Sequence, residues 1–158
     1  MGEIETKLKA MGLALPPPFT YPSPNRTGAV QVGNLLYLSG HGLSLPELPG
    51  VRQRGKVGSE VSEKDAVQTA RAVALTMLAT IKKHAGDLDR VKRVVEIFGM
   101  VNSAPNFERQ PFVIDGASDL FYELFGPERG QHARSAVGVA ELPHRMAVEI
   151  KGLFELNP

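Results

Sequence analysis

Cysteine is missing from all 158 residues of the chain. Its absence excludes disulfides, thiolate nucleophiles and cysteine-ligated metals. Tryptophan is missing too, and aromatic residues make up only 6% of the chain. The sequence therefore offers no evident platform on which nucleic-acid bases could stack.

The chain also has no large excess of either charge. Its 18 Lys and Arg residues stand against 17 Asp and Glu residues, which gives a net charge of +1 at pH 7. Proteins that bind phosphate backbones usually carry a strong basic excess. Nucleic acid is therefore not expected as the main partner, and the small basic clusters at 52–56 and 90–93 are interpreted as solvated surface.

Long hydrophobic runs are absent as well. No stretch reaches the ~20 apolar residues that cross a bilayer, so no membrane partner is expected. The N-terminal stretch MGEIETKLKAMGL carries two glutamates, which is not the pattern of a secretory signal. With 42% hydrophobic residues, the chain is expected to fold as one soluble, cytoplasmic domain.

Several motifs of common enzymes are missing. There is no phosphate-binding G-x-x-x-x-G-K-[ST] loop, no G-x-G-x-x-G after a strand, and no G-x-S-x-G elbow. The four histidines lack metal-binding spacing, so neither a metal site nor a cofactor is predicted. Ser39 and His41 would share one face of a strand, but a hydrogen-bonding or turn role for Ser39 is favoured over a nucleophilic one.

The N-terminal part, residues 1–25, is predicted to be separate from the main domain at 26–158. Residues 3–13 space their apolar side chains as a short helix that ends at Gly12. Residues 15–25 contain five prolines among eleven residues, which excludes a helix or an inner strand. We expect an extended arm that leads into the domain.

The main domain shows the order β-β-α-β-α-β-β. Ser62 and Asp65 resemble a capping box, and Gly86 ends the long helix that follows. Gly126 is expected to end the second helix. This pattern predicts an α+β fold, a single mixed sheet with two helices on one face. The expected elements are a hairpin at 29–40 around Gly33-Asn34, a loop at 41–58, helices at 62–86 and 111–126, and strands at 91–103, 134–142 and 145–156.

Two opposite charges lie in the last two strands. Arg134 shares one strand face with Ala136, while Val137 and Val139 share the other face, which is interpreted as the core side. Glu149 alternates with the apolar series of the last strand and so points away from the core. One interpretation is a salt bridge across adjacent strands, or two exposed charges. The other is a small cavity in which Arg134 binds a carboxylate and Glu149 orients water.

A family resemblance supports the second interpretation. The segments VGNLLYLSGHG, DRVKRVVEIFGMVNSAPNF, DLFYELFG, HARSAVGVAELP and AVEIKGLFEL occur in this order over residues 26–155. In this order they resemble the YjgF/RidA family of reactive-intermediate deaminases, and in particular a branch labelled endoribonuclease or chorismate mutase-like. The resemblance implies a chorismate mutase-like α+β fold and a homotrimer with one cleft at each subunit boundary. Its better-studied members hydrolyse enamines and imines to 2-keto acids and ammonia without a cofactor.

The resemblance also assigns roles to individual residues. Arg134 would hold the substrate carboxylate, Glu149 would assist the attacking water, and the main-chain carbonyl of Ala136 would contact that water. Ser39 and Gly40 would line the pocket. The chain departs from the usual family residues at four positions: Arg26 replaces a tyrosine, His41 a glutamine, Ala136 a cysteine and Asp119 an asparagine. Arg26 and His41 could serve a larger or more acidic substrate, or lie outside the cleft.

Three functions are carried forward. The first is hydrolytic deamination of small 2-imino or enamine acids. The second is a trimeric binding module for small carboxylates without turnover, although a pure binder has no evident need for Glu149. The third is an RNA-cleaving or translation-inhibiting protein, against which the near-zero net charge counts. One arginine and one glutamate do not make the full dianion site of a chorismate mutase.

Overall fold

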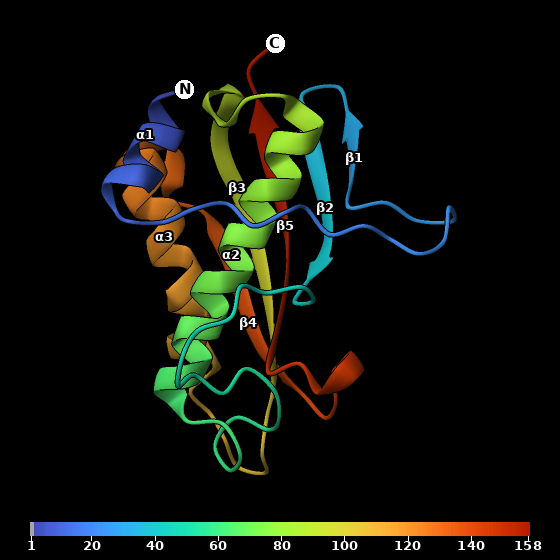
Figure 1. The fold of residues 1–158 in the computed structure, drawn as a ribbon, viewed down its shortest axis with the longest axis vertical. Helices are drawn as coiled ribbons and strands as arrows, with labels where there is room; N and C mark the ends of the chain where they lie inside the picture. Colours follow the sequence, from blue (N-terminus) through green and yellow to red (C-terminus); the bar gives the residue numbers. More distant parts are fainter. Residues whose placement is uncertain (1) are drawn as a thin grey trace.

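The computed structural model describes residues 2–158 (Figure 1). It confirms the order β-β-α-β-α-β-β, with a short helix α1 in front, and so confirms the α+β class. Two short 3-10 helices, Leu88–Arg90 and Pro143–Arg145, connect the larger elements. The helices are α1 (Glu3–Ala10), α2 (Glu63–Ala85) and α3 (Gln110–Gly130), and the strands are β1 (Ala29–Val32), β2 (Leu35–His41), β3 (Val91–Asn102), β4 (Ala133–Val139) and β5 (Val148–Leu156).

The five strands form one sheet in the order β1-β2-β5-β3-β4. Strands β3 and β4 run parallel because α3 crosses over between them, and all other neighbours are antiparallel. Strand β3 therefore lies between β4 and β5, and β4 forms an edge of the sheet.

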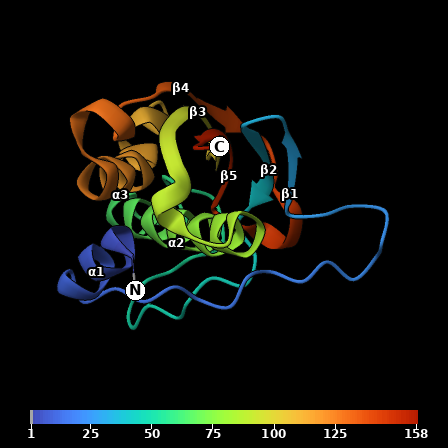
Figure 2. The same ribbon diagram turned by 90° about the horizontal axis from the view of Figure 1, so that it is seen from above.

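The helices pack on one face of the sheet, as Figure 2 shows from above. Helix α2 contacts β2 and β5, α3 contacts β3 and β4, and α1 packs outside against α3. Helices α2 and α3 approach closely at Gly116, where an added Cβ would lie 2.1 Å from the carbonyl oxygen of Val67. A glycine is therefore needed at the point where the two helices meet.

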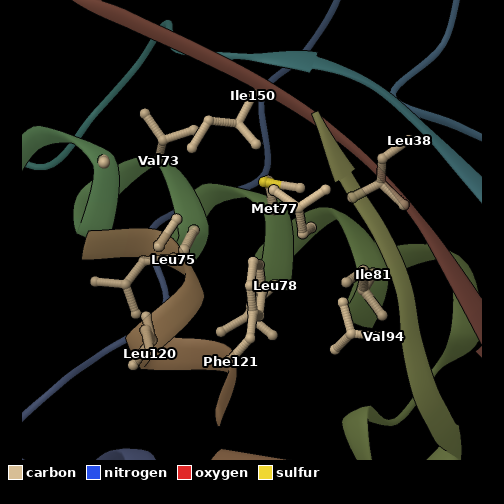
Figure 3. Close-up of a cluster of buried hydrophobic side chains, with 14 of the residues drawn as sticks. Leu38, Val73, Leu75, Met77, Leu78, Ile81, Val94, Leu120, Phe121 and Ile150 are labelled. Carbon is tan, nitrogen blue, oxygen red and sulfur yellow. The ribbon is translucent and has the colours of Figure 1, made fainter. Parts of the chain in front are cut away.

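The core lies between these helices and the sheet (Figure 3). Met77 and Ile81 of α2, Phe121 of α3 and Ile150 of β5 are fully buried there. The ring of Phe121 meets that of Phe154 edge to face, with centroids 5.6 Å apart. Truncating such a side chain to alanine typically costs about 3–5 kcal/mol, so this cluster holds the helices to the sheet.

The ends of α2 follow the sequence expectation. The Ser62 hydroxyl accepts a hydrogen bond from the Asp65 amide at 3.1 Å, and Gly86 ends the helix with φ +85°. Helix α3 differs from the expectation. The backbone leaves the helical conformation at Gly126 (φ 75°, ψ 179°), as predicted, but one more turn begins at Pro127 and continues to Gly130. Proline fits this first helical position because it needs no amide partner there.

The N-terminal segment runs as an extended arm after α1 and crosses α2 on its way to β1 (Figures 1 and 2). Residues 13–28 contain no helix or strand, in agreement with their proline content. Helix α1 is held at its start by Asp89, whose carboxylate accepts hydrogen bonds from the amides of Glu3 (2.7 Å) and Ile4 (2.9 Å). No helix in residues 2–158 combines the length and apolar character that crossing a membrane would require.

Candidate active site

Glu149 projects from β5 toward the face of the sheet that carries no helix. Its neighbours Val148 and Ile150 are fully buried under the helices, so strand alternation directs Glu149 the other way. It lies against Gly40 of β2, where an added Cβ would come within 2.9 Å of the carboxyl carbon. Burial raises the pKa of Glu149 above its ordinary value, because a half-buried carboxylate loses water that would stabilise its charge.

A cavity of about 330 Å³ opens beside this carboxylate. It combines one carboxylate, one guanidinium and a mostly apolar wall, which is typical of a small-molecule site. The β2 residues Gly40 and His41 border it, as does Arg26. Its lining also includes residues that the sequence did not single out, among them Phe19 and Tyr21 of the arm and His144 of the turn before β5.

The two histidines of this cavity differ. His41 is only 4% exposed and is held on both sides, by the Ser39 carbonyl at 2.6 Å from Nδ1 and by the Thr80 hydroxyl at 2.7 Å from Nε2. A carbonyl can only accept, so Nδ1 carries the proton and Nε2 accepts from Thr80. Burial lowers the pKa of His41, which keeps it neutral. His144 is exposed and adopts a left-handed backbone with φ 55°.

Two other candidates from the sequence lie near this cavity. The Ser39 hydroxyl donates to the Thr27 carbonyl at 2.6 Å, so its hydrogen is engaged, and Ser39 does not line the cavity. Arg26 is exposed; it donates to Asn25 Oδ1 at 2.9 Å and lies 5.7 Å from the centre of the Tyr21 ring. The sequence left open whether Arg26 and His41 lie in the cleft. Both residues border the cavity.

Arg134 occupies a separate place, on the edge strand β4 and facing α3. Its side chain is 22% exposed, and Nη1 donates to Asp115 Oδ1 at 2.6 Å and to Ser118 Oγ at 3.1 Å. Nη2 donates to the Pro111 carbonyl at 3.2 Å. A guanidinium has five N–H groups, so within residues 2–158 the Nε–H and one Nη2–H remain for a ligand. Two guanidinium N–H donors are able to bind a carboxylate.

A short hydrogen-bond chain supports this arginine. Ser118 Oγ lies 3.0 Å from His132 Nε2, and His132 Nδ1 lies 2.7 Å from the Gly130 carbonyl. By the same reasoning as above, Nδ1 carries the proton and Ser118 donates to Nε2 while it accepts from Arg134. Burial lowers the pKa of His132, which favours this neutral arrangement; the hydrogen bond to Gly130 opposes the shift, and the Arg134 charge adds to it. Asp119 lies beside Arg134 on the wall of a hollow of about 250 Å³.

Arg134 and Glu149 face opposite sides of the sheet within one chain. Arg134 pairs with Ile97 on the helix side of β3, and Glu149 pairs with Met100 on the open side. One interpretation left open by the sequence, a salt bridge across adjacent strands, is therefore wrong, because β3 separates β4 from β5 and Arg134 pairs with Asp115 instead. The assignment of Val137 to the core side is also wrong: Val137 is 37% exposed, and Ala136 packs against the core because α3 covers that face.

Sequence reasoning missed Asp115, Ser118 and His132 around the arginine. Their partners lie 14–19 residues away along the chain, and no local pattern links a helix to the strand after it at that separation. The arm residues Phe19 and Tyr21 were noticed only as part of a proline-rich segment. No group of three His, Asp or Glu side chains within residues 2–158 could hold a metal ion.

Comparisons with known proteins agree with this architecture. Protein TCP17 of Trypanosoma cruzi is 41% identical over 157 residues, which cover 99% of this chain and 96% of that protein. A crystal structure of a protein of unknown function from Agrobacterium tumefaciens is 39% identical with a TM-score of 0.84, and the match covers 99% of this chain and 93% of that one. A structure from Shewanella oneidensis, titled a "putative endoribonuclease", is 29% identical with a TM-score of 0.87 and covers 98% of this chain and all of the other, 100%.

A family model also matches most of the chain. Residues 5–150 match the family model described as "YjgF/chorismate_mutase-like, putative endoribonuclease". This range contains Arg134 and Glu149, the whole of β1–β4, and the start of β5. The fold expected from the sequence resemblance is thereby confirmed, and the chain belongs to the YjgF/RidA family.

Proposed function

We propose that the protein hydrolyses 2-imino acids, or the enamines that isomerise to them, to 2-keto acids and ammonia. The observation that carries this proposal is the pre-arranged Arg134, held by three acceptors around α3 with two N–H donors left for a ligand. A 2-imino acid presents a planar carboxylate beside an electrophilic C=N carbon. Binding that carboxylate at Arg134 places the reacting carbon at a fixed distance from the guanidinium.

Glu149 supplies the second requirement. A water molecule adds its oxygen to the C=N carbon while Glu149 accepts one proton from it, and Glu149 then passes this proton to the nitrogen. The resulting carbinolamine then loses ammonia as the C–N bond breaks and the C=O bond forms. Burial raises the pKa of Glu149 toward neutral pH. Its carboxylate is therefore a stronger base than that of an ordinary glutamate and accepts a proton more readily.

The two charges belong to one cleft only if different chains contribute them. Because Arg134 and Glu149 face opposite sides of one sheet, we propose that Arg134 of one chain meets the Glu149 cavity of the next in a homotrimer. Exposed apolar side chains on the open face support such an assembly, since large exposed apolar groups favour association. Val30, Val32, Tyr37 and Val137 form this set.

Turnover is preferred to simple carboxylate binding because of Glu149. A protein that only binds carboxylates gains nothing from a second carboxylate placed where burial disfavours its charge. A water-activating base, in contrast, needs that environment.

The test couples the protein to an amino-acid oxidase that releases 2-imino acids, and it follows ammonia and keto-acid formation. We expect acceleration over spontaneous hydrolysis. We expect kcat/KM to fall by about 10²-fold in Arg134→Ala, because charge-assisted hydrogen bonds contribute about 1.5–3 kcal/mol each. Arg93→Ala, at an exposed arginine on the same sheet, is the matched control. No acceleration with any imino acid would refute turnover and leave carboxylate binding.

A further inference from the structure

One wall of the cavity beside Glu149 is made by the N-terminal arm. Phe19 and Tyr21 line it, and their rings meet edge to face with centroids 4.9 Å apart. The proline-rich backbone on either side limits how far this wall can move, because each proline fixes its own φ. Such a pre-arranged wall binds a ligand without first having to become ordered.

The rest of the lining extends this apolar surface. Among the lining residues Glu149 contributes the only carboxylate, and this carboxylate lies against Gly40. The apolar lining residues are Phe19, Tyr21, Pro22, Leu43, Pro143 and Met146.

The size of the cavity bears on the substrate. A volume of about 330 Å³ is that of roughly ten water molecules at about 30 Å³ each. Hydrolysis of an imino acid with a methyl side chain would leave most of this apolar space filled with water. A ring or a long branched side chain would displace that water and meet aromatic partners.

Arg26 does not convert the cavity into an anion site. It is exposed and also lines a neighbouring hollow, which places it at the rim beside Tyr21. Its charge is therefore weakened by solvent. An acidic side chain in the cavity would also share it with Glu149, and like charges at close range repel.

We propose that this wall is the side-chain subsite of the enzyme, and that it selects 2-imino acids with bulky apolar side chains, aromatic ones above all. Phe19 and Tyr21 are then specificity-determining residues. The inference rests on the proposed deamination, which supplies the carboxylate anchor Arg134 and the water site at Glu149.

The experiment measures kcat/KM for imino acids that an oxidase generates from phenylalanine, leucine, alanine and glutamate. We expect wild type to favour the phenylalanine-derived imine over the alanine-derived one by at least about tenfold, since a single lost methylene in an apolar pocket already changes specificity by about 10–200-fold. Phe19→Ala is expected to reduce this ratio to below about threefold. Tyr21→Phe should preserve it, because the ring remains.

Thr20→Ala is the matched control, since Thr20 lies between Phe19 and Tyr21 in the sequence, is exposed and does not line this cavity. An equal loss of the ratio in Thr20→Ala would overturn the subsite and leave a general role for the arm. A preference for the alanine- or glutamate-derived imine would overturn it as well.

A binding measurement separates this inference from the proposed function. Titration calorimetry compares phenylpyruvate with pyruvate on wild type and Phe19→Ala. If no imine is turned over but phenylpyruvate binds at least about tenfold more tightly than pyruvate, and Phe19→Ala abolishes the difference, then the subsite stands and deamination is refuted. If neither turnover nor binding distinguishes the two side chains, the subsite is refuted.

Discussion

At the scale of single residues, Glu149 combines a functional position with a cost to folding. Its pKa is raised in the folded protein, so the native state holds this proton more tightly than the unfolded chain does. The ionised carboxylate therefore lowers stability above its folded pKa, and this cost disappears as the pH falls below the unfolded pKa. In the proposed reaction, the same residue must be ionised to accept a proton from water.

Two measurements follow for Glu149. The acidic limb of kcat/KM against pH should have its midpoint above 4.5, the ordinary value for a glutamate. Glu149→Gln should be inactive, yet should have a higher melting temperature than wild type at pH 7. This gain should shrink as the pH is lowered toward about 4, where both chains carry a neutral group. A limb at or below the ordinary value, together with a less stable Gln variant at pH 7, would contradict the assignment.

Residue roles were only partly predictable from the sequence. Strand alternation correctly placed Glu149 away from the core, because the flanking Val148 and Ile150 mark the buried face clearly. The same rule predicted the wrong buried face for β4, which carries small residues on one face and valines on the other. An edge strand covered by one helix buries whichever face meets that helix, and the size of its side chains does not reveal which face that is.

At the scale of elements, Gly116 makes the contact between α2 and α3 possible. An added Cβ would overlap the Val67 carbonyl oxygen at 2.1 Å, and a backbone oxygen cannot rotate away as a side chain can. We expect Gly116→Ala to lower the free energy of unfolding by about 1–3 kcal/mol, the usual cost of overpacking. Denaturant unfolding would measure it.

The matched control on the same helix is Asp119→Ala, at an exposed position, with an expected change within about 0.5 kcal/mol. An unchanged midpoint for Gly116→Ala would mean that α2 and α3 can separate without loss.

Local signals located these helices well, since capping residues and periodicity are read within one segment. Contacts such as that of Asp89 with the start of α1 join residues 85 and 86 positions apart, so no local pattern could predict them.

At the scale of the whole molecule, the sheet order was the main feature that local pattern could not supply. Consecutive strands are neighbours in most sheets, which favoured a β4–β5 pair, whereas the α3 crossover places β4 on the far side of β3. The family resemblance supplied the fold class correctly because its motifs extend over nearly the whole chain. It did not supply the arm, which lies before those motifs.

A mixing experiment tests whether two chains share a cleft. If the proposed homotrimer forms, the weakly active Arg134→Ala chain and the Glu149→Gln chain, unfolded together in equal amounts and refolded, would form random trimers. Each mixed ring would contain one cleft with both residues intact, so about one quarter of wild-type activity should return. Refolding each variant alone is the control. Failure of the mixture to regain activity, with wild type refolding normally, would show that the cleft does not combine the two residues in this way.

The position of β3 between the two charged strands also bears on how this protein can evolve. Arg134 is held through α3, and Glu149 lies against Gly40, so neither side chain supports the other during folding. A lineage could replace Glu149 and keep Arg134, the proposed carboxylate-binding residue. The raised pKa of Glu149 indicates that such a replacement would increase the stability of the folded protein. If the proposed function holds, one substitution would turn the enzyme into a carboxylate sensor without lowering the stability of the fold.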